Sequence, residues 1–264
     1  MATEWSERQK QDYFLLADTA VLAGEIMLKS GAETHRVEDT IYRILKLSNF
    51  ERCEVLVVTA GIVVTLEDWR IDTISMLRRV GDKTTNLGNI TEVNDISRKL
   101  CSGEISLKQA FHLLKHMESK GYPDIWIYGC MIVAAAGFTI VLGGTFFESV
   151  FAALNGIYLV LSMLFNKRYK VNIFVTNMAV SFLMAFTTRG FSVIPGVQME
   201  IERVIAGSVM MLLPGVAITN AIRDTLHSDY MAGSAKIVEA FAIAASVGVG
   251  IGAGLAIGTM VFGG

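Results

Sequence analysis

Cysteine, a basic charge balance and familiar catalytic motifs are all missing or scarce in this sequence. The 264 residues include three cysteines, and no two of them form a CxxC pair. This pattern favours reduced, structural thiols over a disulfide framework or a zinc site. The formal net charge of −2 argues against nucleic acid as a partner, which would require a basic surface. The sequence also lacks a nucleophile elbow, a P-loop and an HExxH motif. We therefore expect no enzymatic activity, no cofactor, no metal and no ATP-driven transport.

Charged residues are scarce in the second half of the chain. Residues 1–124 contain 16 Lys/Arg and 19 Asp/Glu, whereas residues 125–264 contain 7 and 6. The whole chain is 52% hydrophobic with a mean hydropathy of +0.48, which is too apolar for one ordinary soluble domain. We predict a cytosolic α+β domain over residues 1–124, followed by an all-α membrane domain over residues 125–264. The N-terminus lacks a basic segment followed by a short apolar core, so we expect no signal peptide.

The first domain is predicted to have the element order α-α-β-β-β-α-α. Apolar residues recur at helical spacing over 7–30 and 33–47. Residues 53–59 and 62–66 are instead rich in β-branched residues, and Ala60-Gly61 between them is typical of a turn. The remaining elements are a strand over 71–77 and short helices over 90–100 and 106–119. A domain of this size can bury its own core.

Ionisable residues gather at the start of the second predicted helix. Glu33, His35, Arg36 and Glu38 follow Gly31 within a single loop and first turn. Acidic side chains there suit the helix dipole, so a solvated first turn is one interpretation. A docking or solute-sensing surface is a second, and a catalytic site is a third.

A histidine pair lies on the last predicted helix of the first domain. His112 and His116 have the i, i+4 spacing at which two imidazoles can chelate a metal ion. A third ligand is not apparent nearby, so an exposed helix face is the favoured interpretation.

The second domain is predicted to cross the membrane five times. Each apolar run is about 17–26 residues long, enough for a hydrocarbon core of about 30 Å. Some of the runs contain polar side chains, Asn155 in the second and Asn172 and Asn177 in the third. Polar groups inside spans are candidates for a solute pathway. The predicted spans cover residues 125–142, 149–165, 171–188, 204–221 and 237–262.

The fourth predicted span ends in the stretch that we consider most informative. Pro214 inside this apolar run removes a backbone hydrogen bond and leaves a carbonyl free, which in lipid must be received by protein or by a wet cavity. Asn220, Arg223 and Asp224 follow within one helical turn. Such a combination suits the passage of a polar solute. The alternative is a kinked helix with a solvated end.

The fifth predicted span contains an acidic residue and a series of glycines. Glu239 lies one turn into this span, where an ionisable group is a functional candidate. The alternatives for Glu239 are a carboxylate that reaches the interface or one that pairs with Arg223. Several glycines at spacings of four allow another helix to approach closely. They are Gly248, Gly250, Gly252, Gly254 and Gly258.

Basic residues in the loops predict the orientation. Lys167, Arg168 and Lys170 lie between the second and third spans, and Arg223 and Lys236 lie between the fourth and fifth. Since such loops face the cytoplasm, we place the N-terminus in the cytoplasm and the C-terminus outside a cytoplasmic membrane.

Two motifs resemble those of the threonine/serine exporter family, whose relatives include a two-component succinate exporter. One is Lys29-Ser30-Gly31-Ala32-Glu33-Thr34-His35-Arg36-Val37-Glu38. The other runs from Leu213-Pro214-Gly215 to Asn220-Ala221-Ile222-Arg223-Asp224, and Gly233 and Glu239 also match family positions. The resemblance implies a secondary exporter of small polar metabolites. Fused members of the family carry a second block of about five spans. The chain is therefore similar to the large subunit of a split exporter, whose partner is a small membrane subunit.

We therefore expect a subunit of an exporter for small amino acids or dicarboxylates. An ion gradient, most simply of protons, would drive export. The subunit would belong to a hetero- or homo-oligomer in the lipid bilayer. Arg223 would bind the carboxylate of the solute, and Asp224 or Glu239 would carry the proton. The four asparagines named above would hydrogen-bond the solute. The alternative is a membrane-anchored enzyme or ligand sensor that acts through its cytosolic domain.

Overall fold

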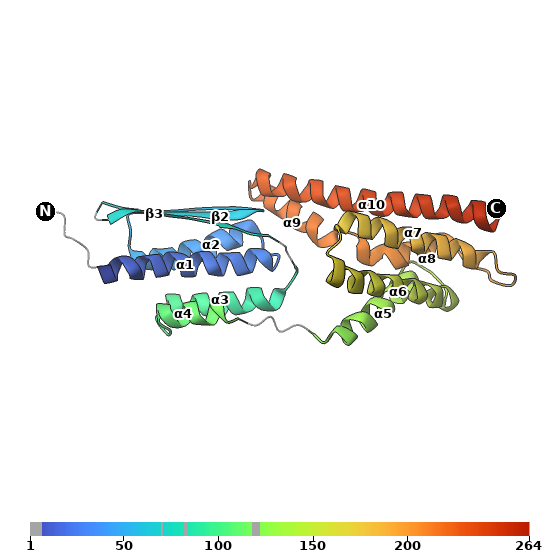
Figure 1. Ribbon diagram of the computed structural model, residues 1–264, viewed down its shortest axis with the longest axis horizontal. Helices are drawn as coiled ribbons and strands as arrows, with labels where there is room; N and C mark the ends of the chain where they lie inside the picture. Colours follow the sequence, from blue (N-terminus) through green and yellow to red (C-terminus); the bar gives the residue numbers. More distant parts are fainter. Residues whose placement is uncertain (1–6, 70, 82–83, 118–121, 264) are drawn as a thin grey trace. The chain divides into compact units, whose positions relative to one another are not determined.

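The computed structural model describes residues 7–69, 71–81, 84–117 and 122–263. Contacts divide the chain into two compact units (Figure 1). The first consists of residues 1–120 and 219–236, and the second of residues 121–218 and 237–264. The contacts thus group the chain differently from the predicted division at residue 124, because residues 219–236 pack with the N-terminal residues.

The first unit has the α+β architecture that the sequence predicts. Helices α1 and α2 precede an antiparallel sheet of order β1-β2-β3, and helices α3 and α4 follow it (Figure 1). The alternating burial along β2 places one face of this strand on the core and the other toward solvent. The bounds are α1 Glu7–Lys29, α2 Thr34–Leu45, β1 Arg52–Val58, β2 Gly61–Asp68, β3 Ile71–Arg79, α3 Leu87–Cys101 and α4 Leu107–Lys115.

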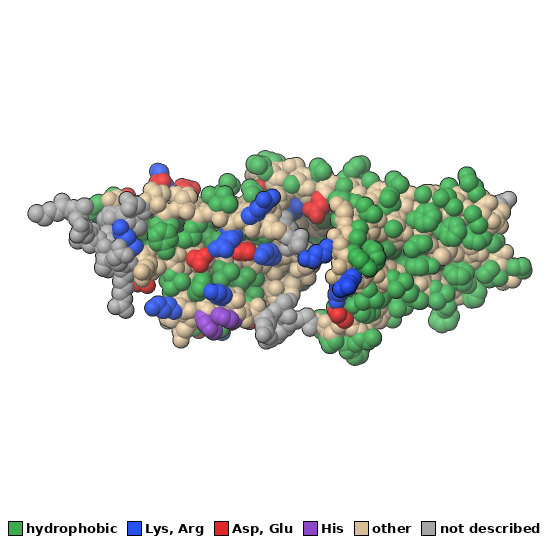
Figure 2. All heavy atoms as spheres, in the orientation of Figure 1, with side chains coloured by type: hydrophobic (Ala, Val, Ile, Leu, Met, Phe, Trp, Pro, Cys, Tyr) green, Lys and Arg blue, Asp and Glu red, His purple; other side chains and the backbone are tan. Residues whose placement is uncertain are grey.

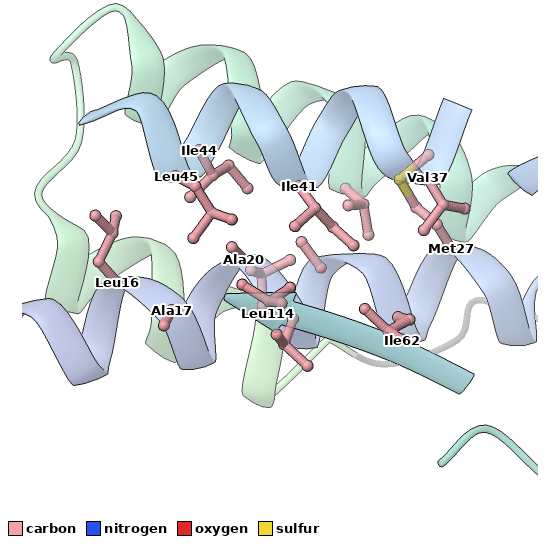
Figure 3. Packing of buried hydrophobic residues seen from close by; sticks show 14 of the residues in the cluster. Leu16, Ala17, Ala20, Met27, Val37, Ile41, Ile44, Leu45, Ile62 and Leu114 are labelled. Atoms are coloured by element: carbon pink, nitrogen blue, oxygen red, sulfur yellow. The ribbon is translucent and has the colours of Figure 1, made fainter. Parts of the chain in front are cut away.

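Side chains from α1, α2, β2 and α4 meet in the core of the first unit (Figure 3). Met27, Val37, Ile41 and Ile62 are fully buried. Helices α1 and α2 approach closely at Gly24, where an added Cβ would lie 2.4 Å from Ile41 Cδ1. This packing fixes the position of the first turn of α2, which carries the ionisable motif.

The second unit is helical, and many apolar side chains are exposed on the face that Figure 2 shows. Helix α5 packs against α6 and α8. The bounds are α5 Asp124–Val141, α6 Phe146–Tyr169, α7 Ile173–Ser192, α8 Ile201–Val209, the short 3-10 turn η2 Met210–Leu212, α9 Gly215–Leu226 and α10 Tyr230–Phe262. The boundary between the units falls within α9 and α10.

By length and apolarity, fewer helices qualify as membrane spans than the five that the sequence predicts. Among the described residues, α5, α6 and α10 are long and apolar enough to cross a membrane, and a bent helix pair, residues 201–226, brings the number to four. Helix α7, predicted as the third span, is not among them. Polar residues such as Asn177 and Arg189 lower its hydropathy. A membrane part built from helices is confirmed, but its five spans are not.

Pro214 divides the fourth predicted span instead of merely kinking it. Helix α8 ends at Val209, and α9 begins at Gly215 after a bend of 58°. The residue before the proline, Leu213, is extended, with φ −73° and ψ 135°, as expected from the clash between a proline ring and a preceding helical residue. The interruption expected from Pro214 is therefore present, and residues 201–226 form a bent helix pair and not one straight helix.

The predicted loop at residues 166–170 is also largely helical. Helix α6 continues to Tyr169 and is ended by Lys170, which has a positive φ of 48°. Lys167 forms an ion pair with Asp124 of α5 at 2.7 Å, which holds this last turn against its neighbour.

The glycines of α10 lie on two faces with different surroundings. Gly250, Gly254 and Gly258 face α7, and an added Cβ at Gly254 would lie 2.5 Å from the carbonyl oxygen of Phe182. Gly248 and Gly252 face open space, with no described atom within 4 Å of an added Cβ. The predicted close approach of another helix is therefore present within the chain, but Gly252 does not take part in it.

We expect Gly254→Leu to reduce the yield of folded protein, because its side chain would overlap the backbone of α7 and overpacking costs about 1–3 kcal/mol or more. Gly252→Leu is the matched control for the fold and should leave the chain folded. Size-exclusion profiles of the purified variants measure both effects. Loss of folded protein in Gly252→Leu alone would contradict this arrangement. If Gly252→Leu folds but no longer forms a complex with another subunit, a helix of that partner packs at Gly252, as the glycine spacing allows.

Candidate functional site

The first turn of α2 and the last turn of α9 meet within the first unit. Glu33, which precedes α2 in an extended conformation, forms an ion pair through Oε1 with Nη1 of Arg223. The hydroxyl of Thr34 donates a hydrogen bond to Oδ1 of Asp224 over 3.2 Å. Each pair joins residues 190 positions apart. The two motifs that carry the family resemblance therefore form one cluster.

Asp224 is the most deeply buried charged residue of this cluster. Its exposure is 0%, and both carboxylate oxygens have partners. Oδ2 lies 2.5 Å from Nζ of Lys236, whose side chain is 11% exposed, and Oδ1 accepts the hydrogen bond from Thr34. A buried carboxylate requires such compensation, because desolvation of an unpaired charge is very costly.

The tight connection between α9 and α10 brings Lys236 to Asp224. The backbone N–H of Asp229 donates to the carbonyl of Asp224 over 3.0 Å. An added Cβ at Gly233 would lie 2.3 Å from the hydroxyl oxygen of Thr225, so the first turns of α10 touch α9 at this residue. Glycine is therefore required at position 233 for the approach of the two helices that forms the buried ion pair.

Two stacked histidines lie next to the Arg223–Glu33 ion pair. The rings of His35 and His227 are stacked, with centroids 4.2 Å apart and planes 7° from parallel. His35 Nε2 lies 3.5 Å from Glu33 Oε2, and His227 Nδ1 lies 2.8 Å from the carbonyl oxygen of Arg223. His35 Nδ1 is buried and has no hydrogen-bond partner among the described residues. Burial is the largest cause that lowers the pKa of His35, followed by the neighbouring His227.

A polar cavity of about 390 Å³ lies beside His35, between α2 and β1. Glu38 borders it and accepts a hydrogen bond from the backbone N–H of Val57 over 3.0 Å, which satisfies part of the edge of β1. Arg36 is exposed. The cavity is lined by His35, Glu38, Asp39, Tyr42, Cys53, Glu54 and Val55.

The comparison with known proteins assigns the chain to a family. A family model described as "Putative threonine/serine exporter" matches residues 18–258. The chain belongs to the threonine/serine exporter family. A relative from Mycobacterium tuberculosis (strain ATCC 25618 / H37Rv), called "Probable threonine/serine exporter", is 23% identical over 237 residues. The match covers 87% of this chain and 44% of the relative, so the chain spans less than half of that protein's length. No solved structure matches the chain.

Membership in this exporter family confirms the resemblance seen in the two motifs. Together with the long apolar helices, it identifies a multi-pass membrane protein of a transporter family. The two motifs on which the resemblance rests contain Glu33, His35, Arg223 and Asp224, which the structure brings together.

The asparagines predicted to line a solute pathway have different surroundings in this exporter-family chain. Asn155 is fully buried and bonded to hydroxyls of α7 and α8, donating to Thr188 over 2.8 Å and to Ser208 over 3.1 Å and accepting from Thr187 over 3.1 Å. Such bonds are typical of contacts between membrane helices. A transport role for Asn155 stays a prediction that would require these bonds to open.

The other predicted pathway residues are more exposed or serve local structure. Asn172 caps α7 by accepting from the N–H of Phe174 over 2.9 Å. Asn177 is buried on α7, Asn220 is half-buried on α9, and Glu239 is exposed on α10. Their transport roles stay predictions.

Sequence reasoning did not identify Thr34, His227 or Lys236 as site residues. Lys236 is one of only seven Lys/Arg in residues 125–264, and this rarity is the signal that could have indicated it. Glu148 was also missed. It is 2% exposed and accepts from the backbone N–H groups of Thr145 and Glu200, both over 2.6 Å, which ties the start of α6 to the start of α8.

Proposed function

We propose that the chain is a subunit of a secondary-active exporter that moves small polar metabolites across the cytoplasmic membrane. The solute class is threonine- or serine-like amino acids or dicarboxylates such as succinate, and the driving force is a proton gradient. The observation that carries the proposal is the paired cluster of Arg223–Glu33 and Asp224–Lys236 at the end of a broken helix pair. Helices interrupted near polar sites are a recurrent feature of secondary transporters.

Arg223 is the proposed carboxylate-binding residue. Its side chain is 50% exposed, whereas its partner Glu33 is 10% exposed, so the guanidinium can be reached from solvent. A guanidinium binds a carboxylate through two parallel hydrogen bonds. The carboxylate of Glu33 thus holds the position that a solute carboxylate would take when the ion pair opens.

Asp224 is the proposed coupling residue. Protonation would cancel its charge and weaken its contact with Lys236, leaving a buried ammonium group without compensation. Such a change favours rearrangement of α9 and α10, the two helices that carry the pair. Glu239, exposed on α10, is the other candidate coupling residue.

A small membrane subunit of the same family is the proposed partner. The matched relative is more than twice as long as the part that this chain covers, since the match spans 44% of it. We propose that the N-terminus is cytoplasmic and the C-terminus lies outside. The packing of residues 219–236 with the N-terminal residues supports placing the connection between α9 and α10 on the same side as the first domain.

The polar cavity beside His35 favours a second candidate function, a ligand sensor or enzyme that acts through the first domain. This candidate predicts that solute binds while export does not occur. Because residues 219–236 complete the cluster, residues 1–124 alone would lack Arg223, Asp224 and Lys236.

Efflux from preloaded cells tests the proposed function. We expect cells that produce the chain together with its small membrane partner to release threonine, serine or succinate faster than cells that produce neither. Cells with the chain alone distinguish a half-transporter from a complete one. Identical release of all three solutes from cells with and without both subunits would contradict the proposal, and solute binding without efflux would favour the sensor.

A further inference from the structure

The carboxylate of Glu33 is shared by two possible cations. Oε1 pairs with Arg223, and Oε2 lies 3.5 Å from Nε2 of His35. Because Glu33 is nearly buried, with a side-chain exposure of 10%, few water molecules can replace either partner. A change in the charge of His35 therefore acts directly on the group that holds Arg223.

Hydrogen bonds indicate which nitrogens of the histidine pair can accept a proton. His227 Nδ1 lies 2.8 Å from the carbonyl oxygen of Arg223, and since a carbonyl can only accept, this nitrogen carries the hydrogen. In neutral His35, a hydrogen on Nε2 faces Glu33 and leaves Nδ1 bare. Nδ1 is buried without a partner among the described residues, so it can take a proton without first losing a hydrogen bond.

We propose that the stacked imidazoles of His35 and His227 form a proton-binding site that controls whether Glu33 holds Arg223. A proton on His35 Nδ1 makes the imidazole a cation and strengthens its contact with Glu33 Oε2 into a charge-assisted bond. It also adds a positive charge beside Arg223. Both effects weaken the Arg223–Glu33 pair and free the guanidinium for a solute carboxylate. This inference rests on the proposed carboxylate-binding role of Arg223.

Charged groups from several elements surround the pair. Burial, His227 and Arg36 lower the pKa of His35, whereas Asp224 and Glu38 raise it, and the result is a pKa below the usual value. The neutral form is therefore the one that the folded cluster favours. Acid weakens the cluster as the pH falls below about 6.5, the usual pKa of histidine. The charged and titratable groups of this region are Glu33, Arg36, Glu38 and Asp39 on α2 or just before it, Cys53 and Glu54 on β1, Arg223 and Asp224 on α9 and Lys236 on α10.

Histidine NMR tests the site without any measurement of transport. The chain has four histidines, so a sample with isotope-labelled histidine gives a small set of imidazole signals. We expect His35 to titrate below the usual pKa of histidine, about 6.5. His227→Phe keeps a ring for stacking but has no ionisable nitrogen, and should shift the titration of His35 upward. His112→Phe is the matched control and should leave it unchanged.

Release of Arg223 is the second readout. An arginine-selective dicarbonyl reagent followed by mass spectrometry gives the ratio of modification at Arg223 to that at Arg43, an exposed arginine paired with Asp39. We expect this ratio to rise several-fold between about pH 7.5 and about pH 5.5, and to stay flat in His35→Phe. A flat ratio in the unmodified chain, or a His35 titration that His227→Phe does not shift, would overturn the inference. Either result would leave the proposed function intact if Arg223→Ala still abolished efflux. Failure of this inference can therefore be distinguished from failure of the proposed function.

Discussion

Replacing Arg223 with alanine should abolish most solute efflux while the protein remains inserted in the membrane. Loss of one partner from a hydrogen-bonded charge pair costs about 3 kcal/mol, on the order of a hundredfold in affinity. The effect on folding should be moderate, because the side chain of Arg223 is 50% exposed, whereas its partner Glu33 is 10% exposed and loses a compensating charge. Efflux assays combined with membrane insertion of the variant separate the two effects.

Arg223→Lys is the more discriminating substitution. Lysine keeps the charge but cannot reproduce two parallel hydrogen bonds to one carboxylate, so we expect this variant to lose activity as well. Arg43→Lys is the matched control, because Arg43 forms an exposed ion pair with Asp39 on the same helix as Thr34. Normal efflux by Arg223→Lys over a range of external pH would show that Arg223 merely stabilises the end of α9.

Replacing Asp224 should have the largest combined effect on stability and transport. Asp224→Ala leaves the ammonium group of Lys236, 11% exposed, without its partner, and breaking a buried pair in this way costs about 3–5 kcal/mol. Asp224→Asn keeps the size and cannot titrate, so it should also lose efflux. Thermal unfolding of the purified variants measures stability, and efflux at several external pH values measures coupling.

A double substitution separates folding from coupling. Asp224→Asn combined with Lys236→Met removes both charges and should recover most of the lost stability, since a buried ion pair replaced by neutral groups is often close to neutral in energy. It should not recover pH-dependent efflux. The exposed pair Asp95–Lys99 provides the control, because the same substitutions there should change stability little. Full efflux in the double variant would remove Asp224 from the coupling mechanism.

Local patterns in the sequence predicted the first unit well. The change from helical spacing to β-branched runs located α1, α2 and the hairpin of β1 and β2 to within a few residues, because these elements depend on neighbours close in the chain. Ser106 begins the last predicted helix of this domain and caps α4 in a capping box with Gln109. Short-range chemistry was sufficient for these features.

The membrane part was predicted less accurately, since hydropathy reports composition and not the path of the backbone. The run over residues 204–221 contains no charged residue and was predicted as one span, and Pro214 divides it into α8 and α9. Glycines at equal spacing in α10 also look equivalent in sequence, but Gly254 touches α7 and Gly252 faces open space. The choice between these faces depends on the neighbouring helix.

The sequence by itself indicated the family, predicted the helical and strand elements of the first unit, and singled out Glu33, His35, Arg223 and Asp224 as candidate site residues. Each of these follows from motifs or from interactions between residues close in the chain. Only the tertiary structure decided that both motifs form one cluster, that Lys236 compensates Asp224, and that His227 stacks on His35. The physical reason is that these contacts join residues as far as 190 positions apart, and such pairings depend on how whole helices pack.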